Sequence, residues 1–398
     1  MSIRAVPWCS RTGDQGCREL SPTSHDFPMK LPIPEHIRSI VPYPPGKPLD
    51  ELERQYGVKN AIKLASNENP WGPSPRAIAA ITAALPTLHR YPDGSSYALT
   101  QALARHLHCA PEMLVLGNGS DEMLGLLVSA CMEPGDEAIS SFPSFLMYQK
   151  CVQVQGCRNI VLPLKDMRHD LEAIARAATS RTRLVFLDNP NNPTGSLFPE
   201  AALLELCRAL PETALVVLDE AYRDFADPAL QLDSVRLAGE QRQGAQIVAL
   251  RTFSKAYGLA GLRLGYGLMR PELAAMLHRV RHPFNVNSLA QVGVVAALAD
   301  QEHYARTISG TRAGLACLQE AVNGLGCRCF PSQSNFFLVD VRGDANRLYE
   351  AMLHRGVITR SMSAYGFPNY LRITVGTEAE NRRFLAALAE CLHELHYV

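Results

Sequence analysis

The chain has 398 residues, of which 47% are hydrophobic and 20% charged, and its 39 basic side chains equal its 39 acidic ones. This length can bury one large core and one smaller core, so two domains are expected. The even charge balance excludes a global field for nucleic acid, and no apolar run reaches the roughly 18 residues that span a bilayer. The 11 cysteines have no paired metal spacing, which favours reduced thiols in a cytoplasmic protein without a metal site.

The N-terminal region lacks the apolar core of a secretory signal. We expect residues 1–38 to be a disordered or dispensable extension, with Met29 as the functional start. Residues 39–85 are expected to form an arm and part of a small domain. Between residues 42 and 48 the prolines exclude a helix, because they lack the backbone N–H and restrict the residue before them.

Strands and helices alternate along residues 86–298, which predicts a large domain built on a mainly parallel, helix-covered sheet. A helix over 96–108 follows from leucines at every fourth position. Further helices are expected over 75–85, 171–178, 199–210 and 273–280, and strands over 114–116, 137–143, 159–163, 182–187, 214–218 and 246–250. Residues 299–398 read as a smaller α+β domain, with helices over 311–322 and 346–355, strands over 335–341 and 370–374, and a closing helix with Leu385, Leu388, Leu392 and Leu395.

Several of these strands run directly into loops of unusual polar content. Ligands collect beyond the carboxyl ends of strands in open α/β sheets, so these loops predict one shared site. The loops are Gly117-Asn118-Gly119-Ser120, Asp188-Asn189-Pro190-Asn191-Asn192-Pro193-Thr194-Gly195, Asp219-Glu220-Ala221-Tyr222 and Thr252-Phe253-Ser254-Lys255.

A flat, phosphorylated pyridine aldehyde held on the amine of Lys255 would give each loop a role. Asp219 would keep the ring nitrogen protonated, while Asn192 and Tyr222 would donate to the ring oxygen. Phe145 would stack on the ring. The residues suited to the phosphate are Gly119, Ser120, Thr252, Ser254 and Arg263, because a helix N-terminus and a guanidinium both bind anions well.

Three segments resemble the fold-type I pyridoxal-phosphate aminotransferases, and among them the histidinol-phosphate aminotransferase family. They are Asn191-Asn192-Pro193-Thr194-Gly195, Asp219-Glu220-Ala221-Tyr222, and the run Thr252-Phe253-Ser254-Lys255 that continues to Arg263. The likeness extends from about Tyr43 to the C-terminus and includes the motifs around Asn67, Tyr91, Asp121 and Arg372. Phe145 departs from the tyrosine that is common there, which keeps stacking but loses a hydrogen bond.

The resemblance implies a seven-stranded mixed sheet and a homodimer whose active sites lie at the subunit interface. Tyr91 would reach the cofactor phosphate of the other subunit, and Asp121 would join the cofactor site. The substrate would meet Tyr43 in the N-terminal arm, Asn67, and two arginines, Arg360 and Arg372, that hold its anionic end.

The implied reaction is transfer of an amino group from L-histidinol phosphate to 2-oxoglutarate, which gives imidazole-acetol phosphate and glutamate in histidine biosynthesis. Lys255 would move the proton of the substrate's α-carbon. Two enzymatic alternatives stay open, an aromatic amino-acid aminotransferase and a decarboxylase of the phosphothreonine type. A transcriptional regulator built on this fold is disfavoured, because the segment before the arm is too short and irregular for a helix-turn-helix domain.

Overall fold

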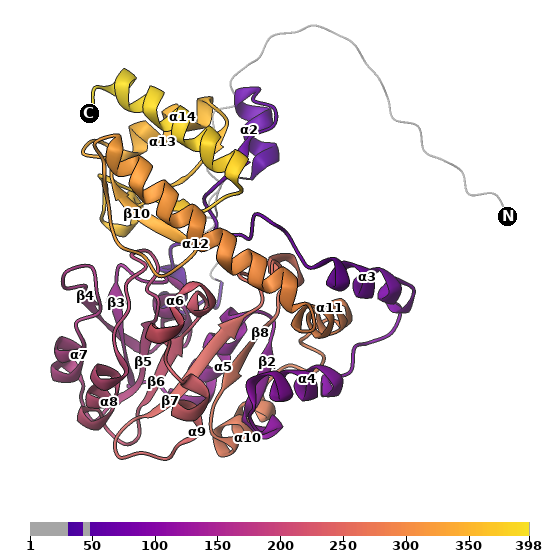
Figure 1. The fold of residues 1–398 in the computed structure, drawn as a ribbon. Coiled ribbons are helices and arrows are strands. Elements are labelled where there is room, and N and C mark those ends of the chain that lie inside the picture. The colour runs from indigo at the N-terminus through magenta and orange to yellow at the C-terminus, as the bar shows by residue number, and fades with distance from the viewer. Residues whose placement is uncertain (1–30, 43–47, 398) are drawn as a thin grey trace, which may run out of the picture.

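The computed structural model describes residues 31–42 and 48–397, so Tyr43, Met29 and most of the expected N-terminal extension lie outside the described residues. The largest element is a seven-stranded sheet with the order β2-β8-β7-β6-β5-β3-β4 (Figure 1). Its strands are β2 (Leu114–Gly117), β3 (Glu137–Phe142), β4 (Arg158–Pro163), β5 (Thr182–Asp188), β6 (Leu215–Asp219), β7 (Gln246–Thr252) and β8 (Gly265–Leu268).

The central strands are parallel, as the alternation of strands and helices predicts. β4, β3, β5, β6 and β7 pair in parallel, and β8 runs antiparallel to both β7 and β2. The sheet is therefore mixed, which the family resemblance implied. The strand pattern alone missed β8, because its sequence Gly-Tyr-Gly-Leu has two glycines and little strand propensity.

Helices cover both faces of this sheet because its strands are apolar on both sides. On β5, Leu184 and Phe186 point to one hydrophobic cluster, whereas Val185 and Leu187 point to another. The first cluster packs under α5 (Ser120–Cys131), α6 (Met147–Val154) and α10 (Pro271–Val280), and the second under α7 (Leu171–Ala177), α8 (Glu200–Ala209) and α9 (Ser234–Gly239).

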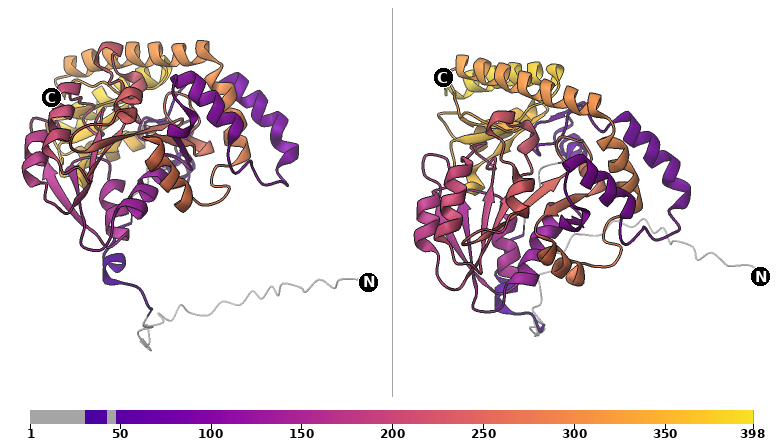
Figure 2. Two further views of the ribbon diagram at one scale, coloured as in Figure 1. Left: turned by 90° about the horizontal axis from the view of Figure 1, so that it is seen from below. Right: turned by 60° about the horizontal axis from the view of Figure 1, so that its bottom comes forward.

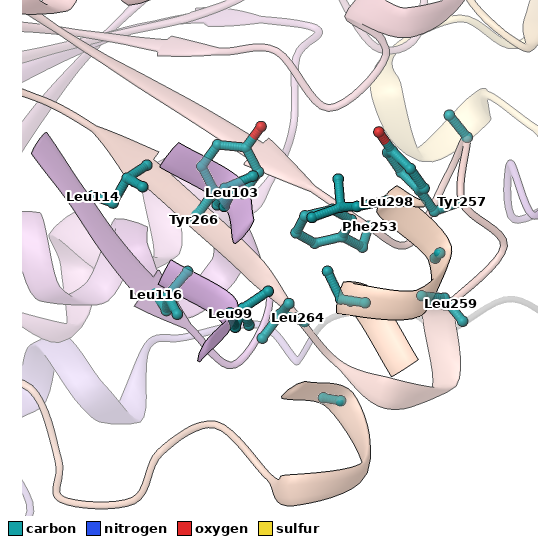
Figure 3. Close-up of a cluster of buried hydrophobic side chains, with 14 of the residues drawn as sticks. Leu99, Leu103, Leu114, Leu116, Phe253, Tyr257, Leu259, Leu264, Tyr266 and Leu298 are labelled. Atoms are coloured by element: carbon teal, nitrogen blue, oxygen red, sulfur yellow. The ribbon is translucent and has the colours of Figure 1, made fainter. Parts of the chain in front are cut away.

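A third group of helices packs beside β2 and β8. It consists of α3 (Pro75–Ala84), α4 (Tyr97–Leu107) and α11 (Ser288–Leu298). Figure 3 shows its core, in which Leu99 and Leu103 of α4 lie beside Leu114, Phe253 and Tyr266. The predicted leucine spacing of residues 96–108 is thus the buried face of α4.

The smaller unit holds a four-stranded antiparallel sheet with the order β12-β13-β10-β9. Its strands are β9 (Arg328–Cys329), β10 (Phe336–Asp340), β12 (Arg360–Ser361) and β13 (Tyr370–Thr374), covered by α13 (Ala345–His354) and α14 (Glu378–Leu395). The N-terminal region contributes α2 (Leu49–Tyr56), which contacts α13, and β1 (Ile62–Lys63), which pairs with β11 (Val357–Ile358). The short α1 (Glu35–Arg38) contacts α6 instead.

The two units are joined by one long helix, α12 (Gln301–Gly324). It is orange in Figure 2, where it runs along the side of the molecule from the sheet region to the yellow small unit. Asp300 caps its first turn, and its buried side chains change from Thr307 and Thr311 to Leu315, Leu318 and Val322 along its length. The sequence predicted only residues 311–322, because the first half is polar and lacks an apolar period.

No helix in the described part of the chain is both long and apolar enough to cross a membrane.

Candidate active site

One pocket collects the polar loops at the carboxyl ends of β5, β6 and β7, opposite the start of α5. Its lining consists of Ser120, Asp121, Phe145, Tyr148, Asp188, Asn192, Asp219, Ala221, Tyr222, Thr252, Ser254, Lys255 and Arg263. The structure therefore brings together nearly all of the residues expected at the cofactor, from segments more than a hundred residues apart.

Lys255 lies just after β7, at the wall of this pocket. Its Nζ donates to the carbonyl oxygen of Ser66 at 3.2 Å and lies 5.7 Å from the centre of the Tyr222 ring. Burial and the nearby Arg372 guanidinium lower the pKa of Lys255 to about 8. A substantial fraction of the amine is then unprotonated near neutral pH, so it can act as a nucleophile and as a base.

Asp219 ends β6 and is buried at the floor of the pocket. One carboxylate oxygen accepts a hydrogen bond from the Tyr148 hydroxyl at 3.0 Å, and the other accepts from the backbone N–H of Ala221 at 3.0 Å. Burial, followed by the neighbouring Asp188, raises the pKa of Asp219 to about 7. A cationic ring nitrogen against this carboxylate would relieve both effects, because a buried charge is stabilised by an opposite one.

A chain of amide and hydroxyl groups faces Lys255 from the side. The Tyr222 hydroxyl accepts from Asn67 Nδ2 at 2.9 Å and from Asn192 Nδ2 at 3.4 Å. Arg372, from β13 of the small unit, donates to Asn192 Oδ1 at 2.6 Å and to the carbonyl oxygen of Ala65 at 2.7 Å. The expected substrate residues Asn67 and Arg372 thus contact the expected cofactor residues directly.

The start of α5 forms a cradle of the size of an anion. Gly119 precedes the helix at φ 82°, and a Cβ there would lie 2.7 Å from Arg263 Nη2. A Cβ on Gly265 would lie 2.4 Å from the backbone nitrogen of Ser120. Backbone N–H groups, the Thr252 and Ser254 hydroxyls and the Arg263 guanidinium surround this space, which suits a phosphate.

Arg263 and Asp121 form an ion pair at the edge of the cradle, with Nη2 and Oδ2 3.2 Å apart. Both side chains are nearly half exposed, so the pair is weak and its guanidinium remains available to an anion. Gly119 itself does not line the pocket but supplies the clearance that the cradle needs.

Asn67 and Arg372 do not line the pocket themselves but contact Tyr222 and Asn192, which do. The remaining expected residues are Tyr91, Arg360 and Tyr43. Tyr91 is 83% exposed and stacks on Phe284 with ring centres 4.9 Å apart. Arg360 does not line the pocket, although it is paired directly opposite Arg372 across β12 and β13. Tyr43 falls outside the described residues.

Sequence reasoning missed two pocket residues, Tyr148 and Asp188. Tyr148 was noticed only as one of the aromatic residues after β3, and nothing in the sequence pairs it with Asp219. Asp188 did carry a signal, because it ends an apolar strand exactly as Asp219 does, and β5 and β6 place the two in register.

Comparison with known proteins supports this geometry. A model of the class I and II aminotransferases matches residues 59–388. Histidinol-phosphate aminotransferase from Desulfotalea psychrophila is 56% identical over 373 residues, which cover 94% of this chain and 98% of that protein. The Moorella thermoacetica histidinol-phosphate aminotransferase is 46% identical over 358 residues, with 90% and 92% covered.

A solved structure agrees with the fold. Histidinol-phosphate aminotransferase from Sinorhizobium meliloti, crystallised in complex with pyridoxal-5'-phosphate, superposes with a TM-score of 0.84 at 31% identity and covers 92% of this chain and 98% of its own. The chain belongs to the class I and II aminotransferase family and, within it, to the histidinol-phosphate aminotransferases.

Proposed function

We propose that this chain transfers the amino group of L-histidinol phosphate to 2-oxoglutarate with pyridoxal 5'-phosphate as cofactor, and so makes imidazole-acetol phosphate and glutamate for histidine biosynthesis. The observation that carries this proposal is the position of Lys255. Its amine lies in a pocket that has a carboxylate, Asp219, on its floor and an anion cradle at the start of α5. An arginine of the small unit, Arg372, contacts the pocket residue Asn192. The names and coverage of the relatives support the same reaction.

The two carboxylates on the pocket floor differ in what they can still accept. Each oxygen of Asp219 accepts one hydrogen bond, which leaves lone pairs for a ring N–H. Asp188 Oδ1 accepts from three side chains, so that oxygen is saturated. Asp219 is therefore the residue suited to hold a proton on the cofactor's ring nitrogen, and the chemistry that a cofactor so protonated would supply is withdrawal of electrons from the substrate's α-carbon.

Lys255 has two tasks in this account. Its amine would hold the cofactor through the aldehyde carbon, and once the substrate's amine had replaced it, the freed Lys255 amine would move the proton of the substrate's α-carbon as general base and acid. Asn192 and Tyr222 would orient the ring through its oxygen, Phe145 would stack on it, and Ser120, Asp121, Thr252, Ser254 and Arg263 would surround its phosphate.

The anionic end of the substrate is assigned to Arg372 and Arg360. Arg372 is buried and already donates to Asn192 across the gap between the two units. Histidinol phosphate has no carboxylate, so its phosphate would take the place that the carboxylate of glutamate takes in the second half of the reaction. Asn67 and Tyr43 complete the proposed substrate site.

A second copy of the chain is proposed to complete each site. Exposed apolar side chains occur on α3, the loop after it, α4 and the loop before α11, and Tyr91 is the most exposed of them. Covering this surface with an identical subunit would bury it and would carry Tyr91 toward the partner's phosphate cradle. We also propose residues 39–85 as the arm and part of the small domain, residues 299–398 as the rest of the small domain, and residues 86–298 as the large domain. Within residues 39–85, α3 packs on α11 of the large unit, so that helix goes with the large domain. The proposed compartment is the cytoplasm.

The direct test is product formation by the purified protein loaded with pyridoxal phosphate. With histidinol phosphate and 2-oxoglutarate together we expect glutamate to accumulate, and neither compound alone should give sustained turnover. The variant Lys255→Ala should lose turnover by at least about a thousandfold while keeping its circular dichroism spectrum. Appreciable transamination by this variant would falsify the assignment of Lys255.

A further inference from the structure

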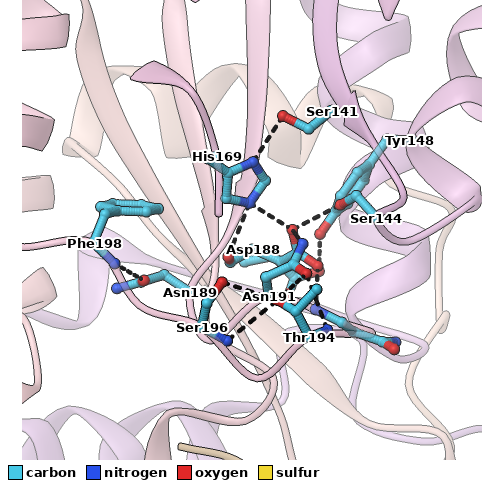
Figure 4. A network of polar contacts seen from close by, with 12 residues as sticks. Ser141, Ser144, Tyr148, His169, Asp188, Asn189, Asn191, Thr194, Ser196 and Phe198 are labelled. Carbon is cyan, nitrogen blue, oxygen red and sulfur yellow. Dashed lines mark hydrogen bonds and ion pairs between the residues drawn. The ribbon is translucent and has the colours of Figure 1, made fainter. Parts of the chain in front are cut away.

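A buried histidine, His169, contacts the pocket residue Asp188, and neither side chain has been given a role in the reaction described above. His169 follows the turn after β4, and its side chain is 1% exposed, while that of Asp188 is 5% exposed. His169 Nε2 lies 2.9 Å from Asp188 Oδ1 and 3.2 Å from the carbonyl oxygen of Asp188. Figure 4 shows the two side chains at the centre of a closed network of polar contacts.

The contacts of His169 determine which of its ring nitrogens carries a hydrogen atom. Both groups that face Nε2 are acceptors, so Nε2 carries hydrogen. Nδ1 lies 2.8 Å from the Ser141 hydroxyl, which can either donate or accept. The ring can therefore hold a second proton without losing a hydrogen bond, and a cationic ring would balance the buried Asp188 carboxylate.

Asp188 in turn lies beside the carboxylate that serves the cofactor. Asp188 and Asp219 are opposite each other in the parallel ladder of β5 and β6, and both line the pocket. Two ionised carboxylates on adjacent strands repel, and the one with fewer hydrogen-bond donors is the first to take up a proton. That one is Asp219, whose pKa burial and Asp188 already raise.

Asp188 also holds the loop that carries Asn192. Its Oδ2 accepts from the backbone N–H of Asn192 at 2.7 Å, and its Oδ1 accepts from Asn191 Nδ2 at 3.0 Å and from the Ser144 hydroxyl at 2.7 Å. Replacing it with asparagine removes the charge and keeps one acceptor oxygen, but the amide nitrogen cannot accept from the donors that face the other oxygen. Asp188→Asn therefore changes both the charge and the loop contacts, and comparison with the double variant separates the two effects.

We propose that His169 is a positioning residue that neutralises Asp188, so that Asp219, one strand away, stays ionised beneath the cofactor ring. The inference deepens the proposed function and rests on it, because it concerns the same pocket. In this proposal the positive charge of His169 balances the negative charge of Asp188, so that Asp188 and Asp219 can both be ionised. The other titratable or charged groups that line this pocket are Tyr148, Tyr222, Asp121, Lys255 and Arg263. Those that line a second pocket together with His169 are Lys165, Asp166, Arg168, Asp170, Glu172 and Glu205.

The test follows the protonation of the bound cofactor, without any amino substrate, so its result does not depend on which substrate is correct. The full chain is loaded with pyridoxal phosphate, and the pH midpoint of the visible absorbance change is measured for wild type, His169→Gln, Asp188→Asn and the double variant. When the cofactor's ring nitrogen is cationic, it disfavours a second positive charge on the nitrogen that links the cofactor to Lys255. Loss of the charge on the ring nitrogen therefore raises the pH midpoint of the absorbance change.

We expect His169→Gln alone to raise the midpoint by about one pH unit. Asp188→Asn alone should leave it unchanged or lower it, and the double variant should return close to wild type, because the pair is removed without leaving a net charge. His303→Gln is the matched control, since His303 is also buried but lies on α12, away from Asp219. It should leave the midpoint unchanged.

An unshifted midpoint in His169→Gln, or a double variant displaced as far as the single one, would overturn the proposal. If His169 has only a structural role, the double variant should be displaced at least as far as His169→Gln, because it loses more contacts than either single variant. Should His169→Gln fail to fold, the comparison moves to the thermal unfolding midpoint. Folding of the double variant then supports the charge balance, and its failure to fold overturns it.

Discussion

At the scale of single residues, the pocket contains two groups whose pKa values have moved toward each other. Burial lowers the pKa of Lys255 to about 8 and raises that of Asp219 to about 7. Each change disfavours the charged form in the empty protein, and each charge becomes useful only when the cofactor is present. The pocket therefore gives up stability that bound pyridoxal phosphate restores.

This view predicts that Asp219→Asn stabilises the empty protein. The unfolded carboxyl ionises near pH 3.8, whereas the folded one holds its proton up to about 7, so folding stability falls as the pH rises between these values. Asp219→Asn has no carboxyl at this position, so its folding stability does not fall for this reason as the pH rises. Above pH 7, chemical denaturation should give the variant a free energy of unfolding that is larger than that of wild type by on the order of a few kcal/mol, as a pKa shift of this size implies. Below pH 4 the two free energies should be equal.

The same variant should lose at least about a hundredfold in turnover and should bind the cofactor more weakly. A wild-type protein that is as stable as the variant at pH 8 would contradict the buried, strained carboxylate described above.

The residues of the pocket were largely predictable, and the reason is local. Asp219 directly follows a run of apolar residues, and Asn192 and Lys255 lie in the polar loops that begin where two other such runs end, so these strand ends are visible in the sequence. Tyr148 was not predictable as a partner, because its contact with Asp219 spans 71 residues and depends on how α6 packs on the sheet. His169 is similar, since it lies on an irregular turn and is buried only by the fold.

At the scale of elements, the anion cradle depends on how closely β8 approaches the start of α5. The antiparallel β8 brings Gly265 against the backbone of Ser120, where no side chain fits. This is the strand that the sequence pattern missed, since two glycines weaken a strand signal while they permit this close contact. The parallel strands, most of which carry runs of apolar residues, were predicted nearly to the residue.

Gly265→Ala is therefore expected to weaken cofactor binding by at least about tenfold, since the backbone of α5 must move away from the new methyl group. Gly125→Ala is the matched control, because Gly125 lies inside α5 with nothing within 4 Å of an added Cβ. It should stabilise the protein by about 0.5 to 1 kcal/mol and leave binding unchanged. The measurement is a titration of the empty protein with pyridoxal phosphate, and equal affinities of the two variants would argue against the cradle.

At the scale of the whole molecule, the site belongs to both units and, in our proposal, to two subunits. Arg372 reaches from the small unit to Asn192 of the large one, while α12 connects the two units. The sequence predicted a small α+β unit at the C-terminus and assigned part of residues 39–85 to it, but it could not show that β1 pairs with β11, about three hundred residues later. Such pairing depends on long-range contacts that have no local signal.

The shared site can be tested by mixing variants. Tyr91→Ala and Lys255→Ala should each be impaired alone, but a hybrid dimer contains one site with both an intact Lys255 and the partner's Tyr91. Random exchange of equal amounts should restore about a quarter of the wild-type sites. Lys255→Ala mixed with Asp219→Asn is the control, because these changes damage one pocket each and no hybrid site is intact. Absence of recovery in the first mixture would show that Tyr91 does not act across an interface.

The central claim is the identity of the substrate, and a single half-reaction tests it most directly. The loaded enzyme is mixed with histidinol phosphate, glutamate, phenylalanine or phosphothreonine, without a keto acid, and the loss of visible cofactor absorbance is followed. We expect histidinol phosphate and glutamate to bleach the enzyme rapidly. Faster bleaching by phenylalanine, or release of carbon dioxide from phosphothreonine, would contradict the proposed role in histidine biosynthesis.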